Sequence, residues 1–137
     1  DFLTKNKFIY KASIYLPNSN IETLFFLKNF LSSVQIDAVA RIILNVDNKD
    51  NQNVNSIIKD INRKNYERIN LREFDSKSSL NYFIIILDTK IWVLSDFGNE
   101  INNNLLFNVS SYHEQGKSFI DLFNKIWSES KISSRLI

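Results

Sequence analysis

The only histidine of the sequence, His113, is the first residue that could do chemistry. It lies in the first turn of a predicted helix, and Lys117 follows one turn later. Free N–H groups at the start of a helix favour anions, so His113 and Lys117 could together bind a carboxylate or a phosphate. The alternative is that His113 is a solvated surface residue. One histidine cannot form a histidine pair for a metal ion or a proton relay within the chain.

Asp88 is the second candidate, because it opens the polar step Asp88-Thr89-Lys90 between two apolar runs. A step of this kind reverses the chain, which predicts a hairpin with an acidic residue at its tip. Asp88 is then either a turn residue or an exposed acid or base. Glu73 and Asp75 could join it in an acidic cluster only if their strands are neighbours.

Aromatic and polar residues surround the same predicted hairpin. Tyr82, Trp92 and Phe97 are close in sequence to Asn81 and Ser95. Stacking on aromatic rings, together with hydrogen bonds from an amide and a hydroxyl, would suit a small polar ligand such as a sugar. The alternative is that these aromatic side chains belong to the core, where such side chains are usually buried.

Two further segments match known sites only by their letters. The polar segment at residues 47–51 lacks the glycine and the glutamate that an EF-hand calcium loop needs. The Asp-Phe-Gly tripeptide at residues 96–98 has neither the glycine-rich loop nor the catalytic loop of a kinase around it. The sequence therefore predicts no metal site and no cofactor.

The composition indicates one domain without strong electrostatic character. The 137 residues, 44% of them hydrophobic, are enough to bury a core. The 17 basic and 15 acidic residues are scattered and form no basic stripe, so we expect no direct contact with nucleic acid. The absence of cysteine excludes disulfides and thiolate nucleophiles. No membrane segment or signal peptide is recognisable, which predicts a cytoplasmic protein or the soluble part of a membrane-associated sensor.

The hydrophobic patterns predict an α/β fold with the order β-α-β-α-β-β-β-β-α. Strands are expected at residues 7–16, 38–46, 66–74, 80–87, 91–94 and 105–109, and helices at residues 21–31, 54–61 and 112–127. Strands separated by helices favour parallel pairs, so we expect a mixed, mostly parallel sheet flanked by helices. Residues 1–130 are predicted to form a single sensor-like domain, cut from a longer protein, and residues 131–137 a linker or tail.

Local sequence also predicts how the helices begin. Ser19 with Glu22, and Ser111 with Glu114, have the spacing of capping boxes. Arg41 lies inside a predicted strand, where a charge needs either a partner or an exit at the edge of the sheet.

The hairpin region resembles one half of the phospholipase D fold. That family has the signature His-x-Lys-x-x-x-x-Asp, followed by Gly-Ser-x-Asn. With Asp88 aligned on the aspartate, the histidine position falls on Asn81 and the lysine position on Phe83, and the second segment begins at Ser95. The C-terminal segment, residues 111–127, looks like the closing helix of phospholipase D-like sensor domains in archaeal histidine kinases and sugar-sensing transcriptional regulators.

The departures from this signature exclude its chemistry. In the family, the histidine is the nucleophile and the lysine binds phosphate oxygens. Asn81 has no basic ring nitrogen, and Phe83 offers a phosphate neither charge nor donor. The resemblance therefore implies a scaffold that has kept the fold and lost the reaction. Half-domains of this type commonly pair, which implies a symmetric homodimer.

These observations predict a non-catalytic sensory or regulatory domain of a signalling protein, such as a sensor kinase or a transcription regulator. The domain would bind a small molecule, dimerise, or do both. The alternatives are a divergent phosphodiesterase or nuclease of the phospholipase D type and a protein-interaction module. The residues expected to contact a ligand are Asn81, Phe83, Asp88, Trp92, Ser95, His113 and Lys117.

Overall fold

A computed structural model provides the fold. It describes residues 8–45, 55–57, 59–60, 68–74, 80–95 and 105–132, with the backbone alone described for residues 105–107. The strands are β1 (Phe8–Leu16), β2 (Gln35–Asn45), β3 (Ile69–Phe74), β4 (Tyr82–Leu87), β5 (Lys90–Ser95), β6 (Leu105–Ser110) and β7 (Lys131–Ile132). The helices are α2 (Ile21–Ser33) and α4 (Glu114–Glu129), and residues 55–57 and 59–60 are also helical.

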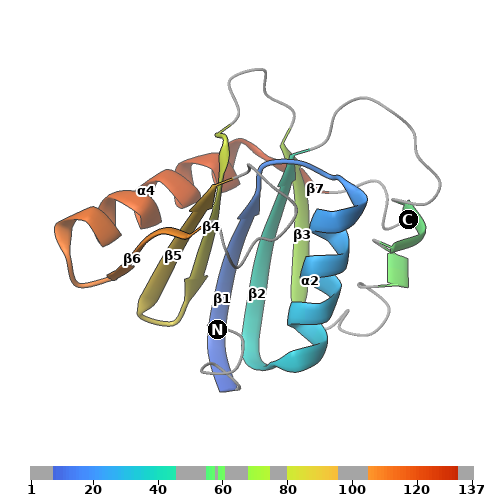
Figure 1. The fold of residues 1–137 in the computed structure, drawn as a ribbon, viewed down its shortest axis with the longest axis horizontal. Helices are drawn as coiled ribbons and strands as arrows, with labels where there is room; N and C mark the ends of the chain where they lie inside the picture. Colours follow the sequence, from blue (N-terminus) through green and yellow to red (C-terminus); the bar gives the residue numbers. More distant parts are fainter. Residues whose placement is uncertain are drawn as a thin grey trace.

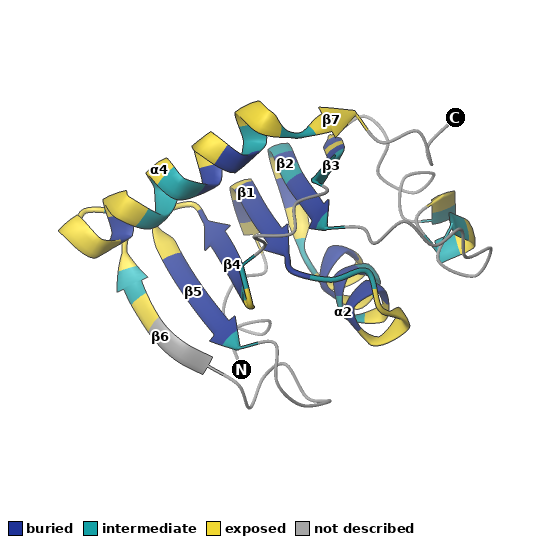
Figure 2. Ribbon diagram, turned by 90° about the horizontal axis from the view of Figure 1, so that it is seen from above, coloured by how far each residue is buried: buried dark blue, intermediate teal, exposed yellow. Residues whose placement is uncertain are grey.

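The strands form one seven-stranded sheet in the order β6-β5-β4-β1-β2-β3-β7. Helix α2 covers one face of this sheet, and α4 crosses the other face diagonally (Figures 1 and 2). The prediction of an α/β fold with a mixed sheet between helices is therefore confirmed.

The prediction of a mostly parallel sheet is wrong. Only β1–β2 and β2–β3 are parallel among the described pairs, whereas β1–β4, β4–β5, β5–β6 and β3–β7 are antiparallel. The reason lies after β3, where the chain crosses to the far side of β1 and then continues by hairpins. The two-residue turn at Asp88 and Thr89 can join only antiparallel neighbours.

The two faces of the sheet bury separate hydrophobic clusters. Strand β4 contributes to both, because its side chains alternate between the faces. Phe83, Ile85 and Leu87 pack on the α2 side, whereas Ile84 and Ile86 pack on the α4 side. This central strand is therefore buried on both faces, as its continuous apolar sequence predicts.

Neither predicted capping box forms. Asn20 is the N-cap of α2 and makes no side-chain capping bond, while the Asn18 side chain accepts from Thr23 Oγ1 at 2.6 Å. His113 is the N-cap of α4, and its Nδ1 accepts from the Gln115 N–H at 3.2 Å. The spacing of serine and glutamate was matched at both helices, but the chain enters each helix later than that spacing requires.

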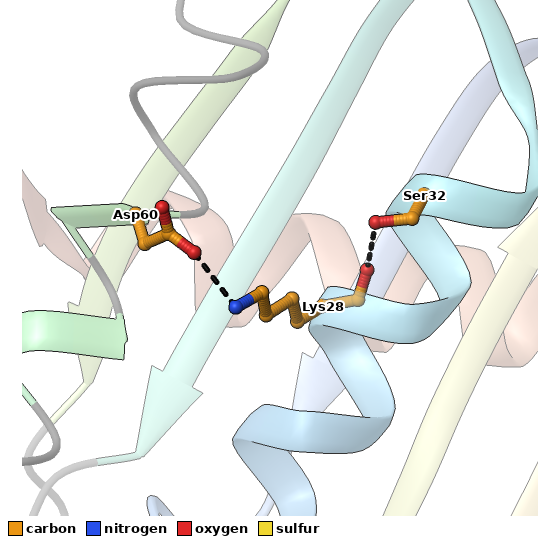
Figure 3. Close-up of polar contacts among 3 residues, drawn as sticks. All are labelled: Lys28, Ser32 and Asp60. Carbon is orange, nitrogen blue, oxygen red and sulfur yellow. Dashed lines mark hydrogen bonds and ion pairs between the residues drawn. The ribbon is translucent and has the colours of Figure 1, made fainter.

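A surface ion pair connects α2 to the helical residues after β2. Lys28 Nζ lies 2.8 Å from Asp60 Oδ2, and Ser32 Oγ donates to the Lys28 carbonyl one turn further along α2 (Figure 3). Both charged side chains are about one-third exposed, so this pair contributes at most about 1 kcal/mol.

Candidate functional site

The polar residues predicted to bind a ligand lie at opposite ends of the sheet. Asn81 precedes β4, and Ser95 ends β5 opposite Tyr82. Asp88 and His113 are at the other end, because the Ser111 N–H donates to the Thr89 carbonyl in the hairpin turn. The six residues of β4 separate the two ends by roughly 20 Å. The structure does not bring these residues into one site.

The apolar residues predicted to contact a ligand are in the core. Phe83 and Trp92 are 2% and 6% exposed and belong to the cluster on the α2 side. Phe83 meets the ring of Phe26 edge-on, with the ring centroids 6.5 Å apart. Tyr82 lies on the opposite face, where its ring meets Phe119, and burial raises the pKa of its phenol. For Tyr82 and Trp92, these placements fit the alternative interpretation of the aromatic residues as core, and Phe97 lies outside the described residues.

Asp88 has a structural role at the hairpin. It adopts a φ of 54°, in the left-handed region. Its Oδ1 accepts from the backbone N–H groups of Tyr10 and Lys11 at 3.1 and 2.9 Å, and its own N–H donates to the Lys11 carbonyl. The register between β1 and β2 shifts at this point, between Ile9 and Lys11. The Asp88 carboxylate thus holds a bulge in β1 against the β4–β5 turn.

We expect the Asp88→Ala variant to lose about 1–2 kcal/mol of unfolding free energy, because two backbone N–H groups lose a charged acceptor and alanine tolerates a positive φ poorly. Asp88→Asn keeps one acceptor oxygen and a residue type suited to this φ, so it should lose less. Urea unfolding of the three proteins measures both differences. Equal stability of Asp88→Ala and the wild type would contradict this role.

His113 and Lys117 are exposed at the start of α4. The Nδ1 atom of His113 is used by the Gln115 N–H, and the His113 carbonyl accepts from the Lys117 N–H. The helix N-terminus is thereby capped by His113 itself, and one of the N–H groups that an anion would use is already bonded.

The acidic cluster does not form among the described residues. Glu73 lies on β3 opposite Leu44, near one end of the sheet, whereas Asp88 contacts Lys11 near the other. Asp75, the segment at residues 47–51 and the tripeptide at residues 96–98 lie outside the described residues. In the described part of the chain, no group of histidines and acidic residues could hold a metal ion.

A cluster that sequence reasoning missed lies between the sheet and the C-terminal half of α4. It consists of two arginines from neighbouring strands and two aromatic residues from one helix, and we call it the arginine cluster: Arg41, Arg72, Phe123 and Trp127. The Arg41 guanidinium lies 5.0 Å from the centre of the Phe123 ring and 5.5 Å from that of Trp127. The Arg72 guanidinium lies 4.2 Å from the centre of the same Trp127 ring.

Hydrogen bonds fix both guanidinium groups of the arginine cluster. Arg41 donates to Ser13 Oγ at 3.1 Å and to Asn124 Oδ1 at 3.2 Å, and Arg72 donates to the Trp127 carbonyl at 2.9 Å. Burial, and secondarily the positive charge of Arg72, lower the pKa of Arg41. The partner that Arg41 needs inside the sheet is therefore a pair of neutral acceptors and two aromatic rings, not a carboxylate.

The comparisons with known proteins show a similarity of fold only. No protein-family model matches the sequence, and a search of curated proteins also finds no match. Among solved structures, the chain is similar to TrmBL2, described as an archaeal chromatin protein with a novel mode of DNA binding. The TM-score is 0.56 at 13% sequence identity, over 96% of this chain and 47% of that one. This chain thus has the fold of about half of a longer protein.

This similarity corrects one prediction about partners. The expectation of no direct contact with nucleic acid was based on the balanced charge of the chain, and a neighbour with the same fold is a DNA-binding protein. Nucleic acid is therefore no longer excluded. No helix in the described residues is long and apolar enough to cross a membrane.

Proposed function

We propose that this chain is a non-catalytic regulatory domain of a protein that acts at DNA, and that it responds to a bound small molecule. The observation that supports the proposal is the fold, which the chain shares along nearly its whole length with half of an archaeal chromatin protein. That neighbour also agrees with the resemblance to the sensor domains of archaeal transcriptional regulators.

The residues at the positions of the phospholipase D signature support the absence of catalysis. Asn81 is exposed but carries no nucleophile, and Phe83 is buried on the α2 side. The His113 side chain caps α4, and it lies at the opposite end of β4 from Asn81. No residue replaces the nucleophilic histidine at its signature position, so a phosphodiesterase of this type is the weaker interpretation.

Hydrolysis of bis(p-nitrophenyl) phosphate tests the catalytic alternative. We expect no rate above the buffer blank for the wild type or for His113→Ala. A rate that is present in the wild type and lost in His113→Ala would overturn the proposal.

A thermal-shift screen against sugars, nucleotides and carboxylates tests the regulatory role, because a ligand that binds only the folded chain raises its Tm. The affinity of the chain for a labelled DNA duplex is then measured with and without the stabilising ligand. A ligand-dependent change supports the proposal. A dimer in solution that no ligand stabilises would favour the protein-interaction module instead.

A further inference from the structure

The arginine cluster places two like charges together on one face of the sheet. Strands β2 and β3 are parallel neighbours, with Arg72 opposite Ile43 and Arg41 opposite Asn70. The two arginines are therefore diagonal neighbours, and both project toward α4 because side chains alternate along a strand. Both guanidinium groups lie within 5.5 Å of the centre of one indole ring.

No carboxylate neutralises this pair within the described ranges. The only ion pair there joins Lys28 to Asp60 on the α2 side. Glu73 is adjacent to Arg72 in sequence, but alternation along β3 directs its side chain to the α2 face with Leu71. Asp121 and Glu129 are exposed on α4. Nearby arginines without an acidic partner repel each other, and the aromatic rings offset only part of that cost.

The arginine cluster also keeps most of its hydrogen-bonding capacity. Each guanidinium has five N–H donors in a planar fork. Arg41 donates one hydrogen bond to Ser13 and one to Asn124, and Arg72 donates one to the Trp127 carbonyl. Both side chains are half-buried, and neither has a buried nitrogen without a hydrogen-bond partner. Fixed, partly desolvated forks of this kind bind planar or tetrahedral oxyanions in a bidentate manner.

We propose that Arg41 and Arg72 together bind the oxyanion group of a small molecule, a carboxylate or a phosphate, beside the Trp127 ring. The role of that molecule as the regulatory ligand rests on the proposed function, but the binding itself does not. The site is separate from the residues around the β4–β5 hairpin, and it uses none of the positions of the phospholipase D signature.

The location of the arginine cluster connects such a ligand to the end of α4. The Trp127 carbonyl accepts from Arg72 and also from the Oγ and N–H of Ser130, where the helix ends. Two residues later the chain forms β7, in which Ile132 pairs with Arg72. An oxyanion on the remaining donors of Arg72 would lie beside the bond that holds this last turn, so binding changes the environment of Trp127.

Titration with inorganic phosphate and with citrate, at constant ionic strength set with sodium chloride, tests the site. The wild-type chain has two tryptophans, so its two indole N–H resonances report on Trp92 and Trp127 separately. We expect a saturable shift of the Trp127 resonance and none of Trp92, which is buried on the other face. The tighter of the two anions identifies whether phosphate or carboxylate is the preferred group.

Variants of the two arginines make the test specific. Arg41→Gln and Arg72→Gln should each weaken binding at least about tenfold, and Arg72→Lys should weaken it because lysine keeps the charge but not the fork. Arg68→Gln is the matched control, since Arg68 is bonded to the Ile36 carbonyl near the start of β3. It removes the same charge outside the cluster and should leave the affinity unchanged.

Three outcomes would overturn this inference: no saturable shift with either anion, equal affinity in wild type and Arg72→Lys, or equal weakening by Arg68→Gln. An unchanged Trp92 resonance shows that a glutamine variant is still folded. If the glutamine variants do not fold, Arg72→Lys alone tests the site, because it keeps the positive charge. Failure here leaves the proposed function intact, because a neutral ligand could still bind elsewhere. Phosphodiester hydrolysis would overturn the proposed function without affecting the anion titration.

Discussion

Replacing Gly116 by alanine should destabilise the chain by about 2 kcal/mol, although the same change in an exposed helix stabilises by up to about 1 kcal/mol. Gly116 is buried in the first turn of α4, against the backbone that leads from β6 into the helix. A β-carbon at this position would overlap the Ser110 carbonyl oxygen and approach Ser111 Cα to 3.2 Å. Backbone atoms cannot move aside as a flexible side chain can.

The clash should separate the start of α4 from the hairpin end of the sheet. The bonds at risk are those from the His113 N–H to the Ser110 carbonyl and from the Ser111 N–H to the Thr89 carbonyl, at 3.1 and 2.8 Å. Urea unfolding of Gly116→Ala measures the loss. Ser118→Ala, two residues later on the exposed side of the helix, is the control and should be close to neutral. A Gly116→Ala variant as stable as the wild type would contradict this close approach.

The sequence predicts the elements of this fold better than their arrangement. The run at residues 82–87 and the helical pattern at residues 112–127 are local properties, and both elements form close to the expected bounds. The position of β4 beside β1 depends on contacts such as that of Ile14 with Ile85, which local periodicity does not encode. A prediction based on the helices between strands therefore overestimates the parallel content of the sheet.

The candidate site shows the same limit. Asn81 and Asp88 were grouped because they are close to one hairpin in sequence, but β4 is long enough to separate its two ends. His113 was chosen from the start of a helix, and the structure places it at the Asp88 end. Arg41 was recognised as a charge in need of a partner, and one of its two hydrogen-bond acceptors comes from α4, 83 residues later at Asn124. The sequence showed an arginine inside a strand and aromatic residues on one face of a helix. Neither pattern predicts that the two are in contact.

Trp127→Ala is the second variant for which we expect a large effect, a loss of about 2–3 kcal/mol for a half-buried indole that packs on Phe123 and on both arginines. The Phe123 and Trp127 rings are stacked, with their centroids 6.2 Å apart. Removing the indole takes away that packing and also the ring that lies against Arg41 and Arg72. The two positive charges then remain near each other with less to offset their repulsion.

A double-mutant cycle separates these two contributions. In the wild type, Arg72→Gln should destabilise, because the contact with the ring is lost and the Trp127 carbonyl loses a donor. In the Trp127→Ala background the same change should cost about 1 kcal/mol less, since the ring is already absent and the repulsion of Arg41 is relieved. Urea unfolding of the four proteins gives the coupling energy.

The control cycle pairs Trp127→Ala with Arg68→Gln, whose effects should add, because Arg68 contacts the Ile36 carbonyl and not the ring. Additive effects of Trp127→Ala and Arg72→Gln would mean that the indole does not hold the arginine. The oxyanion site would then lose its physical basis, because it requires two guanidinium groups kept together despite their repulsion. Coupling of Trp127 with Arg72 but not with Arg68 would instead show that the indole stabilises the two neighbouring arginines. Their remaining N–H donors would then be held in place for a ligand.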